Sequence, residues 1–223
     1  MELNRLLIRK FDHLSKRFWL LRYLLFALFY IYNIYGSSIM HLHKKTKKTK
    51  IHPTAQIHPS ACISPWGVHI GKDVIIGEKT VIKPHTTIHS GAIIRDQCVI
   101  GDSGYQIYRY KKKRLPIIHT GQVILSEDVD IRPNTCIDRG LFGKITYIGP
   151  RSMIGEQVHI GHNIWIGSDS IIEEKVTIGG NTFIGEKVHI GNNSVISNRI
   201  NISSNSILKP GTIATRDIMD NTA

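Results

Sequence analysis

The stretch YIGPRSMIGEQVHIGHNIWIGSDSIIEEKVTIGGNTFIGEKVHI, residues 147–190, places an aliphatic residue at every sixth position. In the longer run from Ile148 to Leu208, eleven consecutive aliphatic residues keep this spacing. The next residue is often glycine, and the fourth residue after the aliphatic one is small or β-branched. A period of six fits neither a helix nor a simple alternating strand. It is typical of the hexapeptide repeat of a parallel β-helix.

Each hexad is expected to form one short strand and one turn, so that three hexads make one triangular coil. The aliphatic side chains then point inward and stack along the solenoid axis, and the glycines are expected to supply the turn conformation. The spacing extends back to Ile51 with two frame shifts and one interruption. The repeat predicts an all-β solenoid over residues 51–212, with roughly eight or nine coils and a tail over residues 213–223.

Residues 1–50 carry most of the positive charge, with 11 Lys and Arg against 2 acids, whereas residues 51–223 carry 18 against 15. They also hold an aromatic, aliphatic run, residues 18–35, that has cations on both sides. Because cations stay on the cytoplasmic side of a membrane, a helix lying in the interface is favoured over a crossing helix. A crossing, or packing of the helix on protein, remains an alternative. We therefore predict a helical segment over 1–50 that binds an anionic membrane surface.

The cysteines and the charge of the body of the chain, residues 51–223, limit the cellular compartments and the kinds of partner that are expected. Cys62, Cys98 and Cys136 are too few for a disulfide framework, which favours a reducing compartment. We predict a cytoplasmic protein that is peripherally attached to the inner face of the cell membrane. The nearly neutral body argues against nucleic acid as a partner.

One segment, residues 102–118, breaks the repeat. It holds the cations Lys111, Lys112, Lys113 and Arg114 next to several tyrosines. Because excursions from a rigid scaffold often carry function, we predict that these cations bind donor or acceptor phosphates, or an acidic carrier protein. A solvated loop tip is the alternative.

Two chemistries are common on hexapeptide β-helices: zinc-dependent hydration of carbon dioxide and acyl transfer. The zinc site needs three converging imidazoles, and the histidine expected five residues after His162 is Gly167, so no metal site is predicted. Acyl transfer needs a base and a donor for an oxyanion. His162 lies two residues after the inward Ile160, in a turn where it is expected to be exposed at a groove. Gly180 lies three hexads later, one coil further, where its backbone N–H can lie close to the group that His162 activates.

The stretch from Val99 to Gly167 resembles the UDP-3-O-acylglucosamine N-acyltransferase family of lipid A synthesis. The likeness is carried by Gly104-Tyr105, by Ile-Asp-Arg-Gly at 137–140 and by His162-Asn163. It implies a left-handed parallel β-helix, a homotrimer with active sites between subunits, His162 as general base and the Gly180 amide as oxyanion donor. The candidate substrate- and donor-binding residues are Tyr105, Lys111, Lys112, Lys113, Arg114, His119, Asp138, Arg139, Gly140, His159, Asn163 and Trp165. Trp165 is expected to face outward, where it lines the acyl groove or a trimer interface.

The chain also departs from that family. We expect it to lack the family's uridine-binding domain and C-terminal helical extension, and Arg199 and Glu156 stand where the family has His and Asn. We predict transfer of an acyl group from a thioester, on acyl carrier protein or CoA, to an amino or hydroxyl group of a sugar or UDP-sugar in lipid A or envelope synthesis. No other cofactor is expected. An acetyl-CoA-dependent acetyltransferase of envelope polysaccharide and a non-catalytic trimeric scaffold at the membrane remain alternatives.

Overall fold

The computed structural model describes residues 23–35 and 48–219. The chain divides into two compact units. One is a solenoid that extends to Gly104 and resumes at His119. The other combines a helix over residues 23–35 with Tyr105–Ile118.

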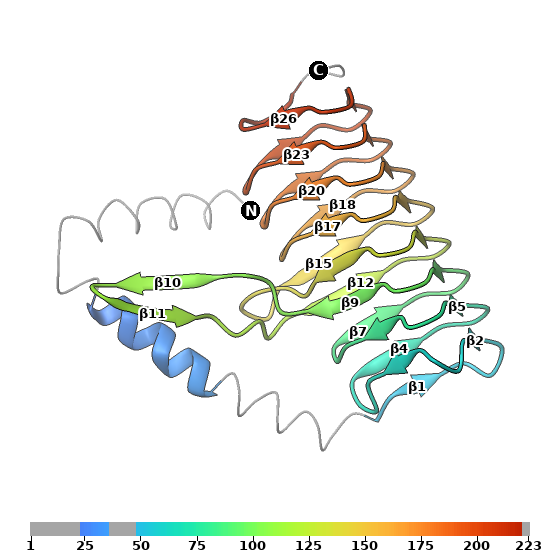
Figure 1. Cartoon of the computed structure of the whole chain (residues 1–223), viewed down its shortest axis with the longest axis horizontal. Coiled ribbons are helices and arrows are strands. Elements are labelled where there is room, and N and C mark those ends of the chain that lie inside the picture. Colours follow the sequence, from blue (N-terminus) through green and yellow to red (C-terminus); the bar gives the residue numbers. More distant parts are fainter. Residues whose placement is uncertain (1–22, 36–47, 220–223) are drawn as a thin grey trace. The chain divides into compact units, whose positions relative to one another are not determined.

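The solenoid consists of three parallel sheets of eight strands each (Figure 1). The first sheet contains β1 (Lys50–Ile51), β4 (Val68–Ile70), β7 (Thr86–Ile88), β12 (Gln122–Leu125), β15 (Ile145–Ile148), β18 (Trp165–Ile166), β21 (Phe183–Ile184) and β24 (Asn201–Ile202). The second contains β2 (Gln56–Ile57), β5 (Ile75–Ile76), β8 (Ile93–Ile94), β13 (Asp130–Ile131), β16 (Met153–Ile154), β19 (Ile171–Ile172), β22 (His189–Ile190) and β25 (Ile207–Leu208). The third contains β3 (Cys62–Ile63), β6 (Val81–Ile82), β9 (Val99–Asp102), β14 (Cys136–Asp138), β17 (His159–Ile160), β20 (Thr177–Ile178), β23 (Val195–Ile196) and β26 (Ile213–Ala214).

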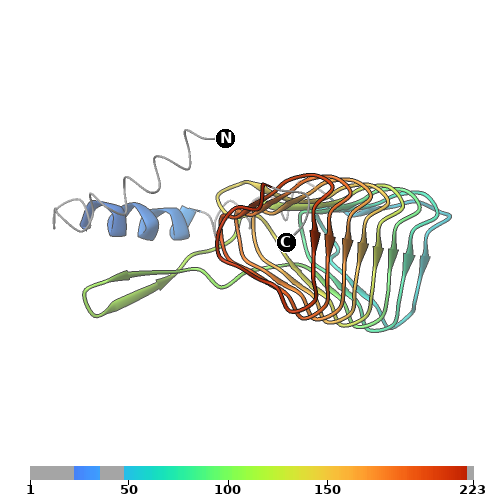
Figure 2. The ribbon, with the colours of Figure 1, turned by 90° about the horizontal axis from the view of Figure 1, so that it is seen from above.

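The chain visits the three sheets in turn, so that each strand pairs with the strand one coil earlier and one coil later. In the regular part the step is three hexads, as between the paired residues His159 and Thr177. Seen from above, the coils stack with their strands in line (Figure 2). This is a left-handed parallel β-helix, and its eight coils confirm the fold and the coil count that the repeat predicts.

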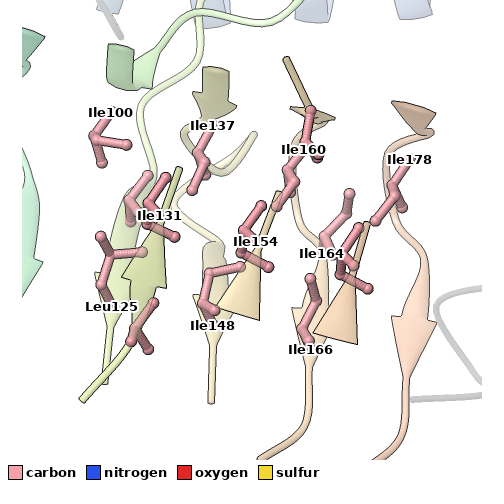
Figure 3. Packing of buried hydrophobic residues seen from close by; sticks show 14 of the residues in the cluster. Ile100, Leu125, Ile131, Ile137, Ile148, Ile154, Ile160, Ile164, Ile166 and Ile178 are labelled. Carbon is pink, nitrogen blue, oxygen red and sulfur yellow. The ribbon is translucent and has the colours of Figure 1, made fainter. Parts of the chain in front are cut away.

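The inward aliphatic residues form a continuous core (Figure 3). Ile148, Ile154 and Ile160, one from each sheet, are fully buried. Burying such a side chain stabilises the fold by roughly 1.5–3 kcal/mol. The small residues at the fourth position add polar links between coils: the Ser152 hydroxyl donates to the carbonyl of Gly167 at 2.9 Å and accepts from the N–H of Ser170 at 3.2 Å.

Among the repeat glycines of the described residues, only Gly101 has a positive φ, 83°, so the expectation that these glycines supply the turn conformation was wrong for the others. Gly149 and Gly155 do not have positive φ; the left-handed residue lies two positions later, as at Arg151 and Gln157. A Cβ on either glycine would lie 2.6–2.7 Å from the backbone of the next coil. Glycine is therefore needed because successive coils approach closely there.

The excursion contains a β-hairpin, with β10 (Ile107–Tyr110) antiparallel to β11 (Lys113–Pro116). The helix over residues 23–35 packs on it, with Phe29 and Tyr108 rings 4.8 Å apart. Within the described residues, no helix has both the length and the apolar character that crossing a membrane requires. The predictions made for residues 1–22 and 36–47 lie outside the described residues.

Candidate active site

His162 follows β17 in a turn that Asn163 completes with a φ of 57°. Its side chain is only 8% exposed in the single chain, so the expectation of an exposed ring was wrong. The ring is covered from two directions. His119 lies on one side with a ring-centroid distance of 5.2 Å, and Gly180, one coil later, lies against the ring on another.

The space that a side chain at Gly180 would occupy is filled by the imidazole of His162. A Cβ built on Gly180 would be 2.7 Å from Cε1, 2.8 Å from Nε2 and 3.0 Å from Nδ1 of that ring. Between Ile148 and Leu208, the same repeat position in the other hexads always carries a side chain, as at Glu156, Ser168 and Glu174. The predicted proximity of His162 and Gly180 is confirmed. The missing side chain at 180 is the feature of the sequence that marks this site.

His119 is completely buried beside His162, although the sequence placed it only at the end of the excursion. Gly104, at the start of the excursion, has no room for a side chain either. Its Cβ would be 2.5 Å from Oδ2 of Asp138 and 3.1 Å from Nε2 of His119. Gly104 therefore allows Asp138 and His119 to approach the same point. Gly104 is not among the site residues that the sequence predicts.

Burial controls the charge of His162. It lowers the pKa of the imidazole to about 4, and the nearby charges of His119, Arg199 and Lys144 act in the same direction on that pKa. The ring is therefore neutral at neutral pH, and one of its nitrogens is free to accept a proton. A neutral imidazole is the form that a general base requires.

Asp138 and His159 form a polar pair, and the Asp138 carboxyl lies on the same side of Gly104 as His119. Oδ2 of Asp138 lies 3.6 Å from Nε2 of His159, with the carboxyl buried and the imidazole exposed. Burial raises the pKa of Asp138 to about 6; His159 opposes this rise and Asp102 adds to it. The pair offers a carboxylate acceptor and an exposed imidazole to a polar acceptor molecule.

Cys136 stands next to this pair because β14 and β17 are in register, with Cys136 opposite His159. Together with Asp138 they place three possible metal-ligand atoms within 4.8 Å of one another. Burial, followed by the charges of Asp138 and Asp102, raises the pKa of the thiol to about 11, which opposes metal binding by thiolate at neutral pH. Histidine spacing in the sequence does not reveal this cluster.

Three of the predicted binding residues have structural contacts. Arg139 is buried, and its Nε donates to the carbonyl of Gly101 at 2.7 Å. Gly140 lies too close to the backbone of Lys144 to carry a side chain. Oδ1 of Asn163 accepts from the N–H of Leu141 at 2.7 Å. These contacts hold the segment after β14 in place.

The remaining predicted residues lie on the surface of one unit or the other. Trp165 is 47% exposed and stacks on Tyr147 at 4.1 Å, which confirms that it faces outward. Tyr105 is 88% exposed. It belongs with Lys111, Lys112, Lys113 and Arg114 to the hairpin unit, and the predicted role of these residues in binding phosphates stays a prediction.

Comparison with known proteins supports the fold and the chemistry. The family model for the bacterial transferase hexapeptide (six repeats) matches residues 67–102 and 145–180. The second of these ranges contains His159, His162 and Gly180. No curated protein sequence matches the chain.

Solved structures that resemble the chain include acyltransferases. LpxA from Acinetobacter baumannii is 26% identical, with a TM-score of 0.54, over 75% of this chain and 67% of its own. A UDP-N-acetylglucosamine acyltransferase is 28% identical, with a TM-score of 0.49, over 72% of this chain and 64% of its own. A GDP-perosamine N-acetyl transferase from Caulobacter crescentus, solved as a point mutant with CoA and GDP-perosamine, is 17% identical, with a TM-score of 0.33, over 70% of this chain and 53% of its own.

The matched region spans about two thirds of the length of the first two of these proteins and about half of the third. The coordinates show a left-handed parallel β-helix, two stretches of which match the bacterial transferase hexapeptide repeat, and the likeness to LpxA from Acinetobacter baumannii supports an enzyme that transfers acyl groups.

Proposed function

We propose that the protein transfers an acyl group from a thioester to an amino or hydroxyl group of a sugar or nucleotide sugar used in the cell envelope. The observation that carries this proposal is the neutral His162 imidazole held against Gly180 in a hexapeptide solenoid. The likeness to LpxA from Acinetobacter baumannii supports the reaction class. Lipid A synthesis is the context that the sequence resemblance favours.

In the proposed mechanism, His162 accepts the proton of the acceptor N–H or O–H as that atom attacks the thioester carbonyl. A C–N or C–O bond forms, and the carbonyl oxygen becomes an oxyanion that accepts a hydrogen bond from the Gly180 N–H. When the intermediate collapses, the C–S bond breaks and the leaving thiolate takes the proton from His162. Donor and acceptor supply all atoms and electrons of the reaction.

The acceptor is proposed to contact the Asp138–His159 pair. Of the two, His159 is exposed, whereas Asp138 is buried and 3.6 Å away. A sugar hydroxyl can donate to the carboxylate and accept from the imidazole. Pairing of this kind would orient the acceptor beside His162.

We further propose a homotrimer, as the sequence resemblance implies. The outer face of the second sheet supports association, because Ile75, Met153, Ile171 and Ile207 are each 39–52% exposed on it. Exposed apolar side chains gathered on one face mark a surface for protein contacts, and here Asp130 and His189 interrupt the row. We also propose that Trp165, which is exposed on the first sheet, lines a groove between subunits.

The test is a screen of thioester donors with the purified full-length protein. Thiol release from acetyl-CoA and consumption of long-chain acyl carrier protein are each measured with a panel of UDP-amino sugars and polysaccharide sugars. His162→Ala is compared with His69→Ala, which removes an exposed imidazole elsewhere on the solenoid. We expect His162→Ala to lower turnover by about 100-fold to 10,000-fold and His69→Ala to leave it unchanged.

The outcomes separate the alternatives. Transfer from acyl carrier protein identifies an enzyme close to the lipid A type, whereas transfer from acetyl-CoA alone identifies an envelope acetyltransferase. Full activity of His162→Ala would refute the proposed role of His162 as general base. No transfer from any pairing of donor and acceptor, by a folded trimer, would favour a scaffold.

A further inference from the structure

The helix over residues 23–35 directs its one strongly polar side chain toward the hairpin segment. Asn33 donates from Nδ2 to the carbonyl of Pro116 and accepts at Oδ1 from the N–H of Ile118 at 2.9 Å. The same helix packs Phe26 and Phe29 on Tyr108, with ring centroids 6.2 and 4.8 Å apart. The helix is therefore fixed to the hairpin through both its polar group and part of its apolar surface.

The opposite face of this helix is apolar and exposed. Leu24, Leu28, Ile31 and Tyr35 follow the helical spacing and are 49%, 61%, 47% and 64% exposed. No charged residue occurs between residues 23 and 35. A helix on a water-facing protein surface shows the reverse arrangement, with polar residues outward. The outer face is thus suited to an apolar environment.

The hairpin adds a concentrated positive charge to the same unit. Residues 105–118 carry five cations, Arg109, Lys111, Lys112, Lys113 and Arg114, and no acid. Without these five, residues 51–223 hold 18 − 5 = 13 cations against 15 acids, a net −2. Beyond residue 50, the excess of positive charge therefore lies in residues 105–118 and not in the rest of the chain.

The cations lie at one end of the helix. Lys111 and Lys112 form the hairpin turn, and the adjacent Tyr110 contacts Tyr23 at the start of the described helix, with ring centroids 6.2 Å apart. Asn33, near the other end of the helix, binds the base of the hairpin. Helix and hairpin therefore lie side by side within this unit (Figure 1).

We propose that this unit docks onto an anionic lipid bilayer. The face of Leu24, Leu28, Ile31 and Tyr35 enters the boundary between headgroups and acyl chains, where tyrosine is favoured, and the cations of the hairpin turn bind lipid phosphates. An apolar helix face combined with lysine-rich charge is the pattern of interfacial membrane binding. The occupant of the exposed helix face is thus lipid, and the cations of the excursion serve lipid phosphates.

The experiment measures binding of the full-length protein to sedimented vesicles. Vesicles of phosphatidylcholine alone are compared with vesicles holding about 30% phosphatidylglycerol, at about 0.1 M and about 1 M salt. The charge variant combines Lys111→Gln, Lys112→Gln and Lys113→Gln. Its matched control removes three exposed lysines of the solenoid through Lys72→Gln, Lys187→Gln and Lys209→Gln.

We expect the charge variant to lose about 100-fold in binding to anionic vesicles, because each lysine near the surface contributes about a five-fold gain. High salt should produce a similar loss in the wild type, and the control should bind as the wild type does. A second variant, Leu28→Ser with Ile31→Ser, should weaken binding to both kinds of vesicle. Both effects are read without turnover, so they are independent of the proposed acyl transfer.

Three results would overturn the proposal. Unchanged vesicle binding by the charge variant, with a raised KM for the thioester donor or the sugar, would assign the lysines to substrate phosphates. A change of molar mass in light scattering for the Leu28→Ser, Ile31→Ser protein, with vesicle binding kept, would make the helix face a contact between copies. Equal binding of the solenoid control and the charge variant would leave only unspecific charge attraction.

Discussion

Replacing Gly180 by Ala tests the central geometry of the site with one added methyl group. The new Cβ would lie 2.7–3.0 Å from three atoms of the His162 ring, whereas unstrained carbon contacts begin near about 3.5 Å. The ring must therefore move by roughly 0.5–1 Å. Because φ at Gly180 is not positive, the backbone itself accepts alanine, and the effect comes from the ring.

The displacement should lower kcat/KM by about 100-fold, since a shift of about 1 Å in a catalytic group costs this much. Overpacking should also destabilise the fold by about 1–3 kcal/mol. Activity is followed by thiol release with the best donor and acceptor pair, and stability by urea denaturation. The matched control is Glu186→Ala, which removes an exposed side chain at the same repeat position and should leave both quantities unchanged.

The decisive measurement repeats Gly180→Ala in a His162→Ala background. With the ring absent the clash is gone, so the substitution should become neutral or stabilise by about 0.4–1 kcal/mol through the unfolded chain. The sign of the stability change therefore reverses between the two backgrounds, which is a direct coupling between the residues. The same loss of stability and activity in both backgrounds would refute the contact between Gly180 and His162.

Four further predictions concern charge and packing. The pKa of His162 is lowered to about 4, so its neutral form persists to mildly acidic pH. We therefore expect kcat/KM to stay level from neutral pH down to about 5 and then to fall. His119→Gln removes a nearby charge that lowers this pKa, so the fall in kcat/KM should begin at a higher pH. Between about pH 4 and 6.5, His162 binds a proton more readily in the unfolded chain than in the native protein. The free energy of unfolding of the wild type should therefore fall as the pH drops through this range. Urea denaturation should show a fall that is up to about 3 kcal/mol larger in the wild type than in His162→Gln. Asp138→Asn should stabilise the fold by about 2 kcal/mol at pH 7.5, because the carboxylate is charged at that pH although its surroundings raise its pKa to about 6. An equal or lower urea midpoint for this variant would contradict the prediction. Ile160→Ala changes a fully buried core residue and should lower the free energy of unfolding by about 2–5 kcal/mol in the same assay.

Much of the fold was readable because its determinant is local and periodic. Each hexad buries one aliphatic residue, so the strand of every regular coil can be placed from Ile148 onward by counting six. The same count places Gly180 one coil after His162, because three hexads close a coil. Hence Gly180 was identified as a neighbour of His162 without coordinates.

Predictions failed where side chains from different coils meet. His162 was expected to be exposed but is covered, because His119 returns from the excursion and fills the space beside it. Cys136 pairs with His159 one coil later, although an insertion makes that coil longer than three hexads. Neither contact follows from a period of six.

The sequence by itself therefore determined the solenoid, its coil count and the adjacency of His162 and Gly180, because a buried aliphatic residue in each hexad leaves a pattern that survives in one dimension. Only the tertiary structure decided the burial and neutral state of His162, the approach of His119 and Asp138 around Gly104, and the attachment of the helix to the hairpin through Asn33. These features depend on contacts between residues that are far apart in the chain, and the segments between them are of irregular length, so no repeat in the sequence predicts which residues meet.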